Sequence, residues 1–212
     1  FINGYASNWF NKGEYADTTS QAILSMANSV SKEKDPLMTP PEAMEDVDMY
    51  YYKTAACLNI LCNSVLVSER FDFAFKTYIT RWAYKHPQPN DFFRTMNDAA
   101  GEDLNWFWKE WFFETWNLDQ SVKNVNYIKD NPQHVALITI ENLGQMALAV
   151  TIKITESNEK SGEISLPVEI WQRGAEWTFR YNSISSLTLV VIDPQIQLPD
   201  IDRTNNTWKG TP

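Results

Sequence analysis

The spacing of apolar residues changes near residue 120, and this change limits the chain to two dissimilar parts. Before it, apolar residues recur every three or four positions, which is typical of helices packed on a core. After it, β-branched residues alternate with polar ones in short runs separated by turn residues, as in antiparallel strands. We therefore expect an α+β chain with two segregated parts. Residues 1–119 would form an antiparallel helical array, and residues 120–212 an antiparallel β-sandwich with an extended C-terminal tail.

Composition supports a folded chain and excludes some partners. The 212 residues are 43% hydrophobic and 14% aromatic, which is ample for a packed core and argues against disorder. The net charge of −9 repels phosphate backbones, so we expect no nucleic-acid partner. No apolar run approaches the roughly 20 residues of a membrane span, so we expect none, and the sequence assigns no compartment.

The first part shows start and stop signals for several helices. Ser68, Asn90 and Asp103 are candidate N-caps, and Gly101 is a candidate left-handed residue at a helix end. The segment Lys32–Asp46, rich in proline and acidic residues, should be a loop. The expected helices are Tyr5–Phe10, Ala16–Val30, Asp48–Val67, a helix from Ser68 that carries Phe71, Phe75, Tyr78, Ile79 and Trp82 on one face, Asp91–Ala100 and Leu104–Trp116.

The second part contains six runs that predict strands, with turn signals between them. The tail Asp193–Pro212 contains three prolines and should run extended along the sheet. The expected strands are Val122–Ile128, Val135–Asn142, Ala147–Thr155, Glu163–Ile170, Glu176–Asn182 and Leu187–Ile192.

Cysteine and histidine give no metal-site signal. Cys57 and Cys62 are five apart in a helical pattern, where their side chains diverge, so we interpret both as core residues without a bridge. His86 lies at a helix end and His134 opens a strand, and neither has a second ligand at suitable spacing.

Aromatic residues concentrate between Tyr78 and Trp116, which contain five of the nine Trp. Their helical spacing favours a core role, although an exposed Trp face could also stack on carbohydrate. Three consecutive tyrosines, Tyr50 to Tyr52, precede an apolar helix. Successive helical residues lie 100° apart, so at least one of the three should point away from the core.

Several stretches spread along nearly the whole chain occur together in one known family. They are Tyr51-Tyr52-Lys53, Glu69-Arg70-Phe71, WAYKHPQP at 82–89, DFFRTM at 91–96, GEDLNWFW at 101–108, LPVEIW at 166–171, Asp193-Pro194 and Leu198-Pro199-Asp200. Together they resemble the C-terminal part of the aminopeptidase N-like gluzincin zinc metallopeptidases, which include leukotriene hydrolase. The run from Tyr78 to Trp116 is specific, whereas the Y-x-K match alone is weak.

The resemblance implies a parent enzyme that removes residues from peptide N-termini, with zinc held by H-E-x-x-H and a later Glu. This chain has no H-E-x-x-H, and Phe1-Ile2-Asn3 resembles the stretch just after that Glu. We therefore expect a C-terminal fragment that lacks the zinc-binding motif, binds no metal or other cofactor and is inactive alone. Its implied partners are the N-terminal remainder of the catalytic domain and, in the parent, a peptide substrate.

One catalytic residue of the family matches a residue here. The Y-x-K match places the family's catalytic Tyr at Tyr51, whose phenol would donate a hydrogen bond to the oxyanion of the tetrahedral intermediate. Tyr50 and Tyr52 do not match. The alternative is a binding or structural module of a zinc-free relative, in which Trp171 and Trp177 of the sandwich would contact glycan or protein.

Overall fold

The computed structural model describes residues 24–25, 35–45, 48–132 and 134–210. The chain divides into a helical unit, Phe1–Thr115, and a sandwich unit, Trp116–Pro212. The expected helix Tyr5–Phe10 lies outside the described residues, and of Ala16–Val30 only residues 24 and 25 are described, both helical. No helix among the described residues is long and apolar enough to cross a membrane.

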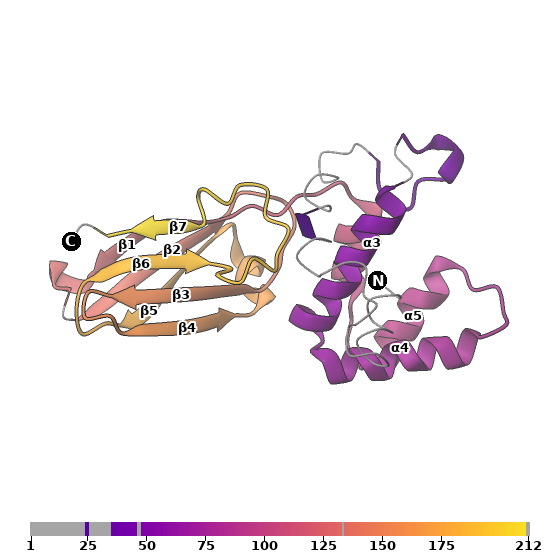
Figure 1. Ribbon diagram of the computed structural model, residues 1–212, viewed down its shortest axis with the longest axis horizontal. Helices are drawn as coiled ribbons and strands as arrows, with labels where there is room; N and C mark the ends of the chain where they lie inside the picture. Colours follow the sequence, from indigo (N-terminus) through magenta and orange to yellow (C-terminus); the bar gives the residue numbers. More distant parts are fainter. Residues whose placement is uncertain (1–23, 26–34, 46–47, 133, 211–212) are drawn as a thin grey trace, which may run out of the picture. The chain divides into compact units, whose positions relative to one another are not determined.

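The helical unit consists of short helices joined by brief loops (Figure 1). Helix α4 packs against α5, and the rings of Tyr78 and Phe92 meet edge to face between them at 4.9 Å. In chain order the elements are η1 Pro41–Ala43, α3 Met49–Ile60, η2 Leu61–Val65, α4 Ser68–Trp82, α5 Pro89–Ala100, α6 Asn105–Trp108 and η3 Lys109–Phe113.

The helix expected over Asp48–Val67 is present, but its last turn is wider than an α-helix. Leu66 N–H bonds to the carbonyl of Leu61, five residues back, at 2.9 Å. Val67 then takes a φ of 59°, which ends the helix. The prediction that Ser68 caps α4 is wrong, because Ser68 is already the first helical residue and Val67 occupies the capping position.

The start of α5 also differs from the prediction. The helix begins at Pro89, which needs no N–H partner there, so Asn90 lies inside it and is not the cap. Gln88 precedes the helix, and its N–H donates to Asp91 Oδ2 at 2.8 Å. At the other end Gly101 has a φ of 64°, which confirms the expected left-handed residue.

The last helix of the unit is shorter than expected. It begins at Asn105 with Leu104 at the capping position, so the prediction that Asp103 caps it is wrong. Asp103 Oδ1 still accepts a hydrogen bond from Asn105 N–H at 3.0 Å. The helical turns stop at Phe113 and not at Trp116, since Glu114 adopts an extended conformation.

Aromatic side chains form much of the core of this unit. Trp108 and Trp111 are each only 2% exposed, which confirms the core interpretation for these two residues. Phe93 stacks on Trp108 with ring centroids 5.0 Å apart. Ile79, expected on the buried face of α4, is exposed instead, while Ala74 on the same helix is fully buried.

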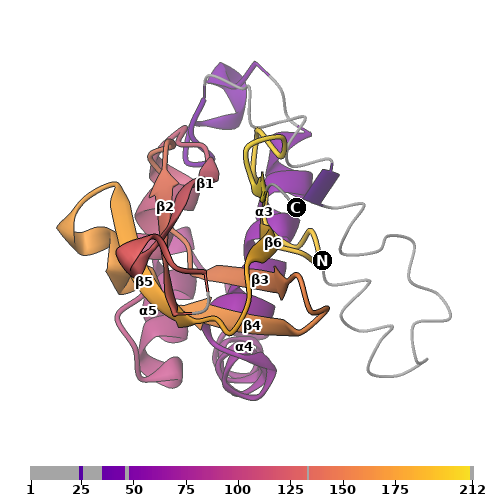
Figure 2. The same cartoon turned by 90° about the vertical axis from the view of Figure 1, so that its left-hand side faces the viewer.

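Seven strands make up the sandwich unit among the described residues, one more than expected. All are antiparallel and lie in two sheets, ordered β1-β2-β5 and β4-β3-β6-β7, which Figure 2 shows as two layers. The strands are β1 Gln120–Tyr127, β2 Val135–Asn142, β3 Val150–Glu156, β4 Ser161–Leu166, β5 Glu176–Asn182, β6 Leu187–Ile192 and β7 Thr207–Lys209. The expected α+β class, a helical part followed by an antiparallel β-sandwich, is confirmed.

The sandwich core follows from the alternation of side chains along each strand. On β2, Ala136, Ile138 and Ile140 are fully buried, whereas the residues between them are only half-buried. Ile152 and Ile154 of β3 are buried in the same core cluster. Because neighbouring side chains of a strand point to opposite faces, each strand supplies one apolar row to the space between the sheets.

The strand expected over Glu163–Ile170 ends earlier. β4 stops at Leu166, and Val168–Arg173 form a 3-10 helix after Pro167, whose ring removes a backbone donor. Trp171 therefore lies in this helix and not in a strand, and its Nε1 donates to the carbonyl of Leu148 at 2.9 Å.

The C-terminal segment was expected to run extended along the sheet, and it also forms a strand and contacts the beginning of β1. Its end forms β7, which pairs with β6. Before it, buried Asp200 accepts hydrogen bonds from Gln120 N–H at 2.8 Å and from Asn206 Nδ2 at 3.0 Å. Burial raises the pKa of Asp200 although these hydrogen bonds act in the opposite direction. The segment thereby fixes the beginning of β1.

Candidate functional site

The candidate site is the tyrosine triplet at the beginning of α3. The N–H groups of Tyr51 and Tyr52 both bond to the carbonyl of Asp48, at 3.0 and 3.1 Å, so the triplet lies on the first helical turn. Side chains here fan out by 100° per residue, which sends the three rings in different directions.

The three rings have different environments. Tyr50 is half-buried, packs beside Leu37 and Met44, and donates its hydroxyl to the carbonyl of Thr39. Tyr51 is 73% exposed and Tyr52 is 36% exposed, which confirms that at least one tyrosine points away from the core. Among the described residues, nothing hydrogen-bonds to the Tyr51 hydroxyl, so this phenol is available as a donor.

Lys53 follows the triplet and is unusual for its burial. Only 8% of its surface is exposed, on the side of α3 that also buries Cys57 one turn later. Burial lowers the pKa of Lys53, while the nearby Cys57 acts weakly in the opposite direction. Burial likewise raises the pKa of the Cys57 thiol well above its usual range. Cys57 and Cys62 are both buried free thiols, so the absence of a bridge between them is confirmed.

The two histidines do not contribute to this site. His86 and His134 are both exposed and lie in different units. Across the described part of the chain, no group of three or more His, Cys, Asp or Glu side chains could hold a metal ion. The described residues therefore do not fit a zinc centre, and any zinc would need ligands from elsewhere.

The tryptophans proposed for the alternative binding role pack against the sandwich core. Trp171 and Trp177 are both half-buried and contact the buried apolar cluster between the sheets. Trp177 lies on β5 with its ring toward that cluster. Neither ring forms the flat exposed platform that sugar stacking needs.

Comparison with known proteins shows first which fold this chain is similar to and then which family it belongs to. The fold, helices followed by an antiparallel sandwich, is that of a region of a known aminopeptidase. The crystal structure of Legionella pneumophila aminopeptidase A in complex with aspartic acid matches 73% of this chain with a TM-score of 0.53 at 15% identity. The family model "Peptidase family M1 domain" matches residues 3–111, about half of the chain. This chain belongs to peptidase family M1.

Two further findings define the extent of the similarity. The matched region is only 18% of the Legionella chain, so this chain spans less than a fifth of that protein. A search of curated protein sequences found no significant match. The family match includes the tyrosine triplet and most of the aromatic run, and it ends before the sandwich.

Proposed function

We propose that this chain is the C-terminal part of a zinc-dependent aminopeptidase-like peptidase. Residues 1–119 would be the helical lobe of its catalytic domain, and residues 120–212 an accompanying β-sandwich domain. The membership in peptidase family M1 carries this proposal, and the likeness of fold to an aminopeptidase supports it. The substrate would be a peptide.

In this proposal the chain is inactive alone. It has two histidines and no H-E-x-x-H, and the described residues offer no metal site. The zinc ligands, the general base and the groups that bind the substrate N-terminus would come from the N-terminal remainder of the catalytic domain. We assign none of those roles to residues of this chain.

Tyr51 would contribute to catalysis by stabilising negative charge. Its hydroxyl is exposed and has no partner among the described residues, whereas the hydroxyl of Tyr50 is held by Thr39. A phenol in this situation can donate a hydrogen bond to the oxyanion that forms when the peptide carbonyl is attacked. The interaction strengthens as charge develops on the oxygen, so it acts on the transition state more than on the bound substrate.

Removal of single hydroxyl groups in the full-length enzyme tests this role. We expect Tyr51→Phe to lower kcat by roughly 10²–10³-fold, the usual effect of losing one oxyanion donor, with little change in KM. Folding should be unaffected, because the ring remains. The measurement is steady-state hydrolysis of an aminoacyl substrate.

Tyr50→Phe and Tyr52→Phe are the matched controls and should change kcat little. If one of them abolished activity while Tyr51→Phe did not, the assignment would be wrong by one position. If all three variants kept near-full activity, the catalytic role of Tyr51 would fail, and the triplet would serve packing alone.

A further inference from the structure

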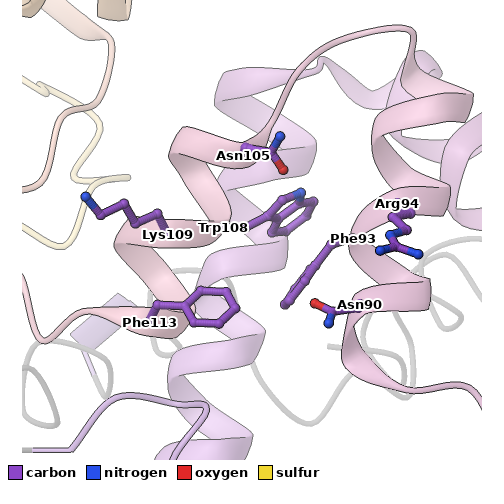
Figure 3. A pocket seen from close by; sticks show the side chains of 7 residues that line it. All are labelled: Asn90, Phe93, Arg94, Asn105, Trp108, Lys109 and Phe113. Carbon is purple, nitrogen blue, oxygen red and sulfur yellow. The ribbon is translucent and has the colours of Figure 1, made fainter.

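A cavity of about 240 Å³ opens between the first half of α5 and the turns of α6 and η3 (Figure 3). Its apolar walls are the rings of Phe93, Trp108 and Phe113. Phe93 and Trp108 stack with 27° between their planes, and the Phe113 ring lies 6.1 Å from that of Phe93. The volume far exceeds the roughly 30 Å³ of one water molecule, so the cavity can accept an organic group.

Two of the three aromatic rings that line the cavity are held in place by their surroundings. Phe93 and Trp108 are 6% and 2% exposed, and Trp108 Nε1 donates to Asn97 Oδ1 at 2.8 Å. Phe113 is 44% exposed and lies at the rim. A ligand ring would therefore contact mainly the exposed ring of Phe113, beside the edges of two rings that are already ordered, and binding would cost little reorganisation there.

The polar edge of the cavity is formed by Asn90 and Arg94, one turn apart on α5 (Figure 3). Both side chains are exposed, and neither has a hydrogen-bond or ion-pair partner within the described part of the chain. On the opposite side, Lys109 Nζ lies 4.0 Å from Glu114, and Asn105 Oδ1 accepts from Asn97 at 3.3 Å. Asn90 and Arg94 are thus the lining side chains with no partner in the described part of the chain, and we take them as the groups that bind a ligand.

We propose that this cavity binds a small aromatic carboxylate. The ring would lie against Phe93, Trp108 and Phe113, while the carboxylate accepts hydrogen bonds from the planar guanidinium of Arg94 and from Asn90. The described lining contains no Asp or Glu, so an ammonium group next to the carboxylate would lie near the Arg94 guanidinium without a lining carboxylate to pair with. The cavity therefore favours an arylalkanoate or an N-acylated aromatic residue over a free amino acid. This site is independent of the catalytic role proposed for Tyr51.

Titration of the 212-residue chain with 3-phenylpropionate tests the proposal, with binding followed by the indole N–H signal of Trp108 in an NMR spectrum. For a ligand of this size we expect a dissociation constant of about 1–10 mM. The neutral 3-phenylpropanamide and zwitterionic phenylalanine should each bind at least about fivefold more weakly, since one lacks the charge and the other adds a repelled ammonium. N-acetylphenylalanine separates the two possible ligands. Tighter binding than 3-phenylpropionate points to the C-terminal aromatic residue of a peptide, and weaker binding to a free arylalkanoate.

Arg94→Gln should weaken binding of 3-phenylpropionate about tenfold, because the charged donor is lost. Arg81→Gln is the control, since Arg81 is an exposed cation on α4 that does not line this cavity. Absence of a saturable shift of the Trp108 signal up to about 20 mM would overturn the proposal. So would equal affinity for the amide, or an unchanged affinity in Arg94→Gln.

Discussion

At the scale of single residues, one buried carboxylate organises a loop of the sandwich. Glu156, at the end of β3, is 1% exposed, and its Oε2 accepts hydrogen bonds from the N–H groups of Ile184 and Ser185, both at 3.0 Å. The Ser185 hydroxyl donates to the same oxygen at 3.1 Å. Burial alone would raise the pKa of Glu156, but these hydrogen bonds and the charge of Lys160 outweigh it and lower the pKa.

This lowered pKa predicts an acid-sensitive contribution to stability. The ionised group stabilises the folded state at pH values above its unfolded pKa of about 4.3, and the contribution is lost as pH falls through the lower folded pKa. We expect Glu156→Gln to reduce the free energy of unfolding by about 1–3 kcal/mol at pH 7. The difference from the unmodified chain should shrink below about pH 4. Urea unfolding at several pH values measures both quantities.

Glu169→Gln is the control, because Glu169 is exposed and has no hydrogen-bond partner among the described residues. It should change stability little at any pH. A Glu156→Gln variant with the same pH dependence as the unmodified chain would contradict this assignment.

The tyrosine triplet shows what local sequence can and cannot predict about the site. Helical geometry alone indicated that the three rings diverge. Which ring becomes available depends on the contact of Tyr50 with Thr39, eleven residues away in the sequence. The family resemblance, and not helical geometry, identified Tyr51 as the catalytic candidate. The polar edge at Asn90 was missed because the residue was interpreted as a helix cap.

At the scale of elements, prediction succeeded where the determining signals are local. The strands Val135–Asn142, Glu176–Asn182 and Leu187–Ile192 have the expected bounds, since alternation and turn residues define both ends. Prediction failed where a run of apolar residues continues beyond the end of a strand. The apolar run after Leu166 passes through Pro167 into a 3-10 helix. The strand β7 could not be foreseen, because it depends on pairing with β6.

The turn between β2 and β3 leads to a prediction about glycine. A Cβ on Gly144 would lie 2.2 Å from the carbonyl oxygen of Asn117 and 2.9 Å from the backbone nitrogen of Asp119. The carbonyl oxygen of Asn117 also holds the turn, since it accepts hydrogen bonds from the N–H groups of Gln145 and Met146, both at 3.1 Å. We expect Gly144→Ala to destabilise the sandwich by about 3 kcal/mol, the upper end of the usual cost of overpacking, because the crowded atoms belong to the backbone. Thermal unfolding measures the effect.

Gly162→Ala provides the comparison within the same unit. There the nearest atom to an added Cβ is the hydroxyl of Tyr181 at 3.1 Å, at the end of a side chain that can move. We expect Gly162→Ala to lower the free energy of unfolding by less than about 1 kcal/mol. Equal losses for the two variants would show that backbone crowding at Gly144 does not control this turn.

At the scale of the whole molecule, two observations support the proposal that the helical unit is part of a larger catalytic domain. Large aromatic side chains remain outside its core, including Tyr51 at 73% and Phe73 at 64% exposed. The chain spans less than a fifth of the Legionella aminopeptidase A chain to which it is similar in fold. Both observations agree with the proposal that an N-terminal remainder completes the catalytic site.

The most direct test of this account compares the 212-residue chain with the full-length polypeptide, both purified without chelator. Zinc content and hydrolysis of aminoacyl substrates are measured for each. We expect well under one zinc per 212-residue chain and no hydrolysis, and about one zinc with aminopeptidase activity for the full-length polypeptide. Stoichiometric zinc held by ligands of the 212-residue chain, or a full-length polypeptide without zinc and activity, would contradict the account.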